Sequence, residues 1–254
     1  MKLDITQELG WVTRKVQQRE HLGRPARVVI ARRDYDTDIA DLWDAITNPE
    51  RLPHWFLPVS GELRVGGRYQ LLGNAGGEIQ ACAPPQQLAL TWQFGSEMSW
   101  LEVQLTRATT ASPDGASSNG ASLDAASLDA ASPDAVSPDA VSSAAPRTRL
   151  ELRHIAHVGG DRWDQFGPGA VGVGWDLTLR GLGRHVWAGG SIDRVAALAW
   201  LASDEGKQFV RESSDSWCRA AIAAGEVSEV ASAAAARTTA AYTGETVPAA
   251  STRG

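Results

Sequence analysis

The sequence contains little cysteine and no long hydrophobic run. Its two cysteines, Cys82 and Cys218, are far apart and provide neither a disulfide framework nor a metal-binding spacing. They are compatible with buried, reduced thiols. No apolar run approaches the roughly 18 residues that cross a bilayer. Acidic and polar residues interrupt the start MKLDITQELGWV, unlike a signal peptide. We therefore expect a cytoplasmic protein without a membrane partner.

Basic patches are also missing, and the acidic net charge is confined to one segment. The formal net charge is -6, and residues 108–146 contain five aspartates but no lysine, arginine or glutamate. Subtracting these five charges leaves -1 for the rest of the chain. Nucleic-acid binders usually carry a basic patch or stripe, and no run here supplies one. We therefore expect no nucleic-acid partner.

The segment 108–146 repeats a Ser-Leu/Pro-Asp-Ala-Ala/Val unit and has no aromatic residue. Such a composition cannot bury enough apolar surface to offset its chain entropy, so we predict a disordered insertion. It separates two predicted strands, 98–107 and 147–156. Growth of a loop from about 5 to about 40 residues costs roughly 2 kcal/mol in closure entropy, which a domain of this size tolerates.

The chain has 43% hydrophobic residues and ten tryptophans, which suffice for a hydrophobic core. Four apolar residues recur near the N-terminus at spacings of four, three and four: Ile5, Leu9, Val12 and Val16. This spacing predicts an amphipathic helix over 4–20. The Val and Ile content of 27–33 predicts a strand. The segment 34–47 then turns into a helix, for which Asp36 or Thr37 is the expected N-cap.

The stretch 48–77 changes structural type several times. Asn48 is a good N-cap before Pro49, so a short helix is expected to end near Trp55 and Phe56. These two rings then lie at a corner between helix and strand. They are either a plug, packed for stability, or a gate to a binding site.

The middle of the chain predicts an antiparallel meander. Gly66-Gly67 is expected to join strands at 62–65 and 68–72 as a hairpin. Further strand patterns follow at 78–83, 87–94 and 98–107. Residues of the same parity share one face of a strand, which groups these apolar side chains: Leu88, Leu90, Trp92, Phe94, Leu101, Val103 and Leu105. One face of the sheet therefore needs a cover.

A long helix after Gly167-Pro168 is the natural cover for this sheet. Its apolar stripe has helical spacing: Val171, Trp175, Leu179, Leu182 and Val186. Gly172 and Gly174 weaken the helix, which indicates close backbone approach to the sheet or a ligand. Further helices are predicted at 192–201 and 204–224, the second capped by Ser203. An alanine-rich tail follows from Gly225, for which one more marginal helix up to Tyr242 is an option, with disorder beyond it.

Four segments resemble one known family: WDAITNPERLPHWFLP, LRVGGRYQL, GGEIQACAPPQQLALTW and TRLELRH. Together they are similar to the AHSA1-like (activator of Hsp90 ATPase homologue) branch of the START/SRPBCC superfamily, which is Bet v 1-like. The resemblance covers about residues 24–188, interrupted by the insertion. It implies an α+β helix-grip fold, in which a curved antiparallel sheet wraps a long C-terminal helix, with extra helices at both ends.

The domain organisation predicted from this resemblance has four parts. They are an N-terminal helical arm (1–23), a START-like domain (24–188) with the insertion at 108–146, a C-terminal helical extension (189–224) and a mostly disordered tail (225–254). The family is expected to hold a hydrophobic small molecule between sheet and helix. The lining candidates are Trp55, Phe56, Leu57, Tyr69, Trp92, Phe94, Leu101, Val103, His154, Trp163, Phe166, Val171 and Trp175.

Catalytic and metal chemistry have little support in the residues. His154 and His157 are three apart on a predicted strand, which places them on opposite faces, so we expect no metal and no cofactor. No pair of carboxylates has a spacing that forces an acid and a base together. His154 shares parity with Leu150 and Leu152 and is expected to point into the cavity, as a ligand anchor or as a satisfied core histidine.

We therefore predict a protein that binds a hydrophobic or amphipathic ligand, without a catalytic residue. Two alternatives remain. One is an enzyme of the cyclase or hydratase kind that uses His154. The other is an interaction protein of the co-chaperone type with a chaperone-like partner.

Overall fold

The computed structural model describes residues 4–108, 145–159, 161–191 and 193–246. Its strands are β1 (Val12–His21), β2 (Arg24–Tyr35), β3 (Val59–Gly61), β4 (Arg68–Leu71), β5 (Gly76–Ala83), β6 (Gln87–Phe94), β7 (Glu97–Arg107) and β8 (Thr148–His157). Its helices are α1 (Ile5–Gly10), α2 (Ile39–Thr47), the 3-10 helix η1 (Leu52–His54), α3 (Asp161–Phe166), α4 (Gly169–Ala188), α5 (Arg194–Ala202), α6 (Asp204–Ala223) and α7 (Ser228–Thr243). Most of the predicted insertion, residues 109–144, lies outside the described residues.

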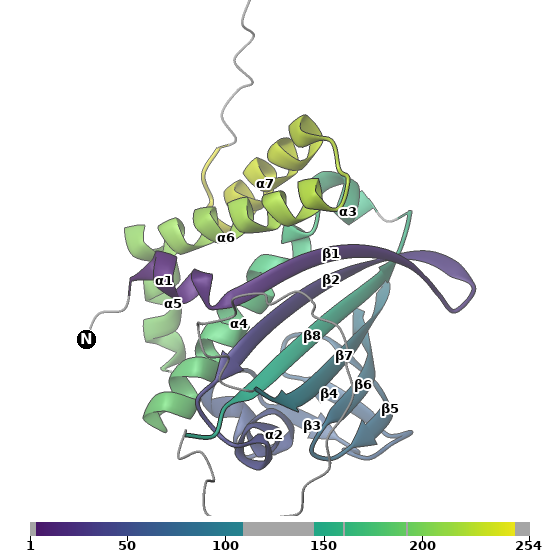
Figure 1. The fold of residues 1–254 in the computed structure, drawn as a ribbon, viewed down its shortest axis with the longest axis vertical. Helices are drawn as coiled ribbons and strands as arrows, with labels where there is room; N and C mark the ends of the chain where they lie inside the picture. The colour runs from purple at the N-terminus through teal and green to yellow at the C-terminus, as the bar shows by residue number, and fades with distance from the viewer. Residues whose placement is uncertain (1–3, 109–144, 160, 192, 247–254) are drawn as a thin grey trace, which may run out of the picture.

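All eight strands form one antiparallel sheet in the order β1-β2-β8-β7-β6-β5-β4-β3. The sheet curves around α4, while α2 lies at one end of the molecule and α6 and α7 lie together near β1 (Figure 1). This arrangement confirms the predicted α+β helix-grip fold, in which an open sheet packs against C-terminal helices.

The N-terminal helix prediction is wrong beyond residue 10. Only α1 is helical, and residues 12–21 form β1, which pairs along its whole length with β2 from Val12↔Arg33 to His21↔Arg24. Val12 and Val16 are both buried, because a spacing of four keeps one face in a strand as well as in a helix. Leu22 and Gly23, both with positive φ, form the hairpin turn that makes this pairing possible.

The hairpin at Gly66-Gly67 exists, but its first strand lies earlier than predicted. β3 pairs with β4 through Val59↔Leu71 and Gly61↔Tyr69, so residues 62–67 form the connection. Asn48 caps the C-terminal end of α2 instead of starting a helix, and Asp38 is the N-cap of α2. The remaining predicted strands of the meander are confirmed within a few residues at their ends.

The C-terminal helices pack on the back of α4. Gly172 does provide close approach, but to α6 instead of the sheet or a ligand: a Cβ there would lie 2.4 Å from the ring of Trp217. Ser203 caps α6 as predicted, and Phe209 and Trp217 are fully buried. α7 corrects the expectation that residues 225–254 are mostly disordered and agrees with the marginal helix considered up to Tyr242; its alanines are buried against α6 and α3.

A buried polar cluster holds β1, α4 and α6 together. Asp176 of α4 is 1% exposed and accepts hydrogen bonds from Arg14 Nε at 2.9 Å, Ser213 Oγ at 2.5 Å and Trp217 Nε1 at 3.1 Å. Burial raises the pKa of Asp176, while the Arg14 guanidinium and these hydrogen bonds oppose that rise.

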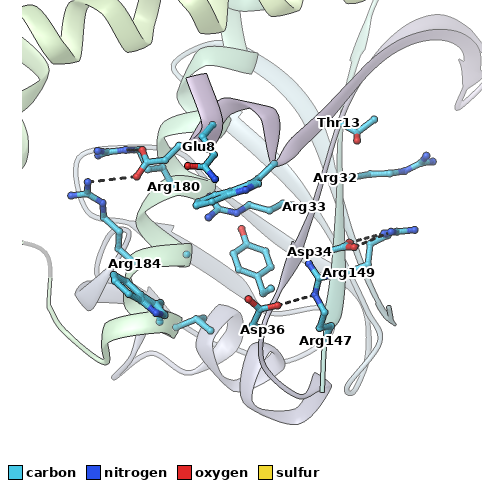
Figure 2. Close-up of a pocket in the computed structure, with 16 residues that line it drawn as sticks. Glu8, Thr13, Arg32, Arg33, Asp34, Asp36, Arg147, Arg149, Arg180 and Arg184 are labelled. Carbon is cyan, nitrogen blue, oxygen red and sulfur yellow. Dashed lines mark hydrogen bonds and ion pairs between the residues drawn. The ribbon is translucent and has the colours of Figure 1, made fainter. Parts of the chain in front are cut away.

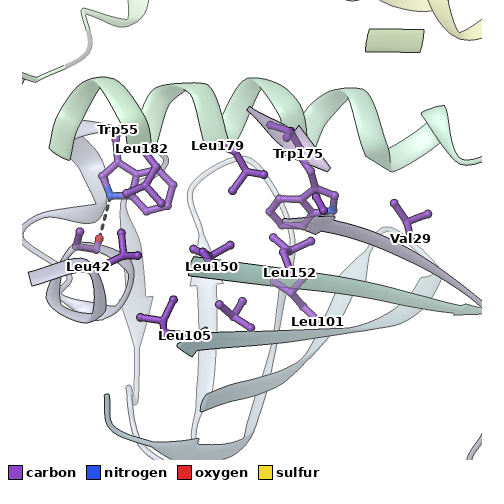
Figure 3. Packing of buried hydrophobic residues seen from close by; sticks show 14 of the residues in the cluster. Val29, Leu42, Trp55, Leu101, Leu105, Leu150, Leu152, Trp175, Leu179 and Leu182 are labelled. Carbon is purple, nitrogen blue, oxygen red and sulfur yellow. Dashed lines mark hydrogen bonds between the residues drawn. The ribbon is translucent and has the colours of Figure 1, made fainter. Parts of the chain in front are cut away.

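The main hydrophobic core fills the space between α4 and the concave face of the sheet. Trp175, Leu179 and Leu182 descend from α4 toward Leu150 and Leu152 of β8 (Figure 3). These five positions follow the helical and alternating periods of the sequence, which is why the core could be read from it.

Candidate functional site

An apolar cavity of about 190 Å³ lies within this core. Its walls come from α4, from η1 and the residues after it, and from the inward faces of β4 to β8. Three lining residues are exposed at the surface, Leu63, Arg64 and Cys82. We infer that the mouth of the cavity lies between the 62–67 connection and the end of β5.

The structure brings seven of the thirteen predicted lining residues together around this cavity. They are Trp55, Phe56, Tyr69, Trp92, Leu101, Val103 and Trp175. The strand members are there because inward parity on β4, β6 and β7 aims them at α4.

The other six predicted residues do not line the cavity, for different physical reasons. Phe94 is 46% exposed at the end of β6, beyond the cover of α4. Trp163 and Phe166 belong to α3, where the Trp163 ring lies under the Arg27 guanidinium carbon at 4.8 Å. Leu57 and Val171 pack against the core elsewhere. His154 does not line the cavity and is hydrogen-bonded to the wall residue Trp175.

Sequence reasoning missed several lining residues. They are Ile46, Leu52, Val59, Leu63, Ile79, Leu88, Leu90, Leu150, Leu152, Thr178, Leu179 and Leu182, together with Thr47, Arg64, Leu71 and Cys82. Many of them share the parity or helical stripe that the sequence already displayed, so that signal could have found them. Cys82 could not be found this way. It is exposed, and not buried as expected. Alternation from Ile79 would place it on the outer face, but the register shift between Ile79 and Ala81 pairs it with Leu88, which lines the cavity.

His154 is a satisfied core histidine. It is 5% exposed on β8, and its inward orientation agrees with the prediction. Trp175 Nε1 donates to His154 Nδ1 at 3.1 Å, and an indole nitrogen can only donate. The ring proton is therefore on Nε2, which lies 2.9 Å from Ser99 Oγ. Ser99 Oγ in turn donates to the carbonyl oxygen of Trp92 at 3.0 Å.

Both ring nitrogens of His154 are thus occupied by protein groups. Burial lowers the pKa of His154 to about 4, because the interior disfavours the charged imidazolium. The side chain is neutral at pH 7 and has no free nitrogen with which to bind or deprotonate a ligand.

The polar side chains of the cavity wall are also engaged. Tyr69 Oη donates to the Thr91 carbonyl at 2.8 Å, and burial raises the pKa of this phenol. Thr47 Oγ1 and Thr178 Oγ1 donate to backbone carbonyls of their own helices at 2.7 and 2.8 Å. The wall therefore presents apolar surface with little directional polarity.

Trp55 has the environment of a plug. Its ring is 8% exposed, and its Nε1 donates to the Ala45 carbonyl at 2.9 Å, which fastens it to α2 (Figure 3). Phe56 stacks beside it with ring centroids 5.6 Å apart and is only partly buried. Trp55 therefore fixes the corner, while Phe56 and Trp92 are the large, partly buried rings of the wall.

No group of three or more His, Cys, Asp or Glu side chains in residues 4–108, 145–159, 161–191 and 193–246 is placed to hold a metal ion. Within the same ranges, no helix is long and apolar enough to cross a membrane.

A curved sheet closed over one long helix, with an apolar cavity between them, is the helix-grip fold. Residues 36–119 match the model of the family described as activator of Hsp90 ATPase homolog 1-like protein. This match covers 84 of the 254 residues and agrees with the resemblance that the sequence motifs show to the same family.

Solved structures agree on the fold. The crystal structure of CalU16 from Micromonospora echinospora has 24% identity and a TM-score of 0.56, with 82% of this chain and 97% of that chain covered. Its solution NMR structure also has 24% identity, with a TM-score of 0.59 and coverages of 84% and 97%. No curated protein matches the sequence. At this identity the likeness concerns the fold alone.

Proposed function

We propose that this protein binds a small hydrophobic molecule in the cavity between α4 and the sheet. The observation that carries the proposal is an apolar cavity of about 190 Å³ that reaches the surface beside Leu63 and Cys82. Water inside it finds few hydrogen-bond partners on the apolar wall, so an apolar molecule that displaces this water is favoured.

The size and polarity of the cavity restrict the ligand. Pockets for drug-sized molecules usually measure about 300 to 1,000 Å³, whereas this cavity measures about 190 Å³. It fits a molecule of one or two rings without rearrangement. A longer ligand requires the partly buried rings of Phe56 and Trp92 to move. Because Tyr69, Thr47 and Thr178 already donate to carbonyls, shape and hydrophobicity select the ligand.

Binding is better supported than catalysis. The cyclase or hydratase alternative requires His154 to exchange a proton with a ligand, but its two nitrogens face Trp175 and Ser99. The co-chaperone alternative requires exposed aromatic side chains at the corner after η1, and Trp55 is buried there. A pull-down with the host's Hsp90 tests that alternative directly, and a stable complex would support it.

Binding of an uncharged two-ring fluorescent dye, 1-naphthylamine, tests the proposal. The dye should bind saturably, and Leu152→Phe should weaken it at least tenfold, because Leu152 lines the cavity and a larger side chain fills it. Leu105→Ala is the matched control. Leu105 is fully buried in the same core but does not line the cavity, so its truncation lowers stability without blocking the site.

Native mass spectrometry of protein purified from its host then identifies the occupant. The proposal fails if no small molecule is retained and the dye does not bind saturably. It also fails if Leu152→Phe and the wild type bind the dye equally.

A further inference from the structure

A second hollow of about 670 Å³ lies on the other side of α4 from the apolar cavity. It is bounded by α1, the start of β1, the end of β2, the residues leading into β8 and the last turns of α4. We call it the arginine cleft, because six arginines line it against three carboxylates, Glu8, Asp34 and Asp36. Its lining therefore carries a formal charge of +3.

Most of these arginines already have a carboxylate partner. Arg149 bonds to Asp34 through two nitrogens at 2.7 and 3.0 Å, and Arg147 Nε lies 2.8 Å from Asp36. Glu8 binds Arg180 and lies 3.7 Å from Arg184. Arg32 pairs with Glu151, outside the cleft. Figure 2 shows the lining residues of the cleft, with the Arg33 side chain between Glu8 and Asp34.

Arg33 is different, because its charge is buried and unpaired. The residue is 8% exposed, and in the described part of the chain no carboxylate lies within ion-pair distance of its guanidinium. Nη1 donates to the Leu179 carbonyl at 3.0 Å, but Nε is buried without any acceptor among the described residues. Burial of an unpaired charge is expensive, so such a group is a strong indication of an anion that binds there.

The surroundings hold the Arg33 guanidinium in place. Gly183 of α4 leaves room for it, since a Cβ at that position would lie 2.4 Å from Arg33 Nη2. The guanidinium carbon lies 5.3 Å from the centre of the Trp11 ring and 5.1 Å from that of Tyr35. A fixed guanidinium presents a planar edge that fits the two oxygens of a carboxylate.

We propose that the arginine cleft binds an aromatic carboxylate, with its carboxylate on Arg33 and its ring against the tryptophans of the wall. Trp11 is 42% exposed and Trp187 is 73% exposed, and both line the cleft. The cleft is within the size range of pockets for drug-sized ligands. This site is separate from the apolar cavity and does not depend on the function proposed for it.

Isothermal titration of the full chain with 2-naphthoate, acetate and inorganic phosphate tests the site. We expect 2-naphthoate to bind at least tenfold more tightly than acetate or phosphate. Arg33→Gln should weaken 2-naphthoate at least tenfold, because it removes the charge and the planar fork. Arg149→Gln is the matched control: Arg149 lines the same cleft but is paired with Asp34, so affinity should change less than threefold.

Two more variants test whether the position of the Arg33 guanidinium matters and which of the two hollows holds the ligand. Gly183→Ala keeps Arg33 but displaces its guanidinium, and should also weaken 2-naphthoate. Leu152→Phe, which fills the apolar cavity, should leave 2-naphthoate binding unchanged. Equal affinity of wild type and Arg33→Gln would overturn the proposal, as would loss of binding in Leu152→Phe. Phosphate bound as tightly as 2-naphthoate would refute the aromatic part of the site.

Discussion

The buried His154 should make this protein sensitive to mild acid. In the unfolded chain its pKa has the ordinary value of 6.5, and in the folded protein burial lowers the pKa to about 4. Above pH 6.5 the imidazole is neutral in both states and contributes no pH dependence. Between the two values the unfolded chain binds a proton that the folded protein does not, so stability falls as pH falls.

The expected size follows from the two pKa values. An interval from 6.5 to about 4, at about 1.4 kcal/mol for each pH unit, gives about 3 kcal/mol of unfolding free energy lost. Most of the loss should already be present at pH 4.5. This is a large share of the 5 to 15 kcal/mol that stabilises a typical domain.

Urea unfolding at intervals from pH 7.5 to 4.5 measures the effect, with His154→Gln as the matched variant. Glutamine can accept a hydrogen bond from Trp175 and donate one to Ser99, as the neutral imidazole does, but it does not titrate. Carboxylates contribute to acid sensitivity in both proteins. Between pH 7.5 and pH 4.5 the wild type should therefore lose most of about 3 kcal/mol more stability than the variant does. A difference that stays constant across this range refutes the reasoning.

Four further variants test the buried ion pair and the packing. Asp176→Ala should cost about 3 to 5 kcal/mol in urea unfolding, since it leaves a buried arginine unpaired; a loss below about 1 kcal/mol would contradict the ion pair. Gly172→Ala should cost about 1 to 3 kcal/mol through its clash with Trp217. Gly174→Ala, which meets only a hydroxyl at 3.2 Å, should be neutral or stabilising. Trp55→Ala should cost about 3 to 5 kcal/mol, as for a core aromatic; a change in dye affinity without loss of stability would instead show a gate.

The sheet and its cover helix could be predicted because their signals are local. Leu88 and Leu90 follow the two-residue period of a strand in β6, and Trp175 and Leu179 follow the helical period in α4. The secondary structure of each element is therefore visible in its own sequence. The prediction for β1 was wrong because it also relied on a local signal: the spacing of Val12 and Val16 fits a helix and a strand equally well. The pairing with β2 decides between them, and that pairing is a long-range contact that the segment itself does not encode.

At the candidate sites, too, the local pattern predicts which face a residue lies on but not its long-range contacts. Parity placed Leu101 and Val103 at the cavity and turned His154 inward, but it could not show that Trp175 and Ser99 would occupy both imidazole nitrogens. Those contacts bring together side chains from three elements.

α4 forms a wall of both hollows, and its helical period separates the two linings. Residues 175, 178, 179 and 182 face the apolar cavity, while residues 180, 183, 184 and 187 face the arginine cleft. Leu179 joins the two sides, because its side chain lines the cavity and its carbonyl accepts from Arg33 and Tyr35. From α4 alone the second stripe resembles a solvated face. It becomes a cleft only because α1 and the ends of β2 and β8 close around it, which leaves Arg33 buried without a carboxylate among the described residues.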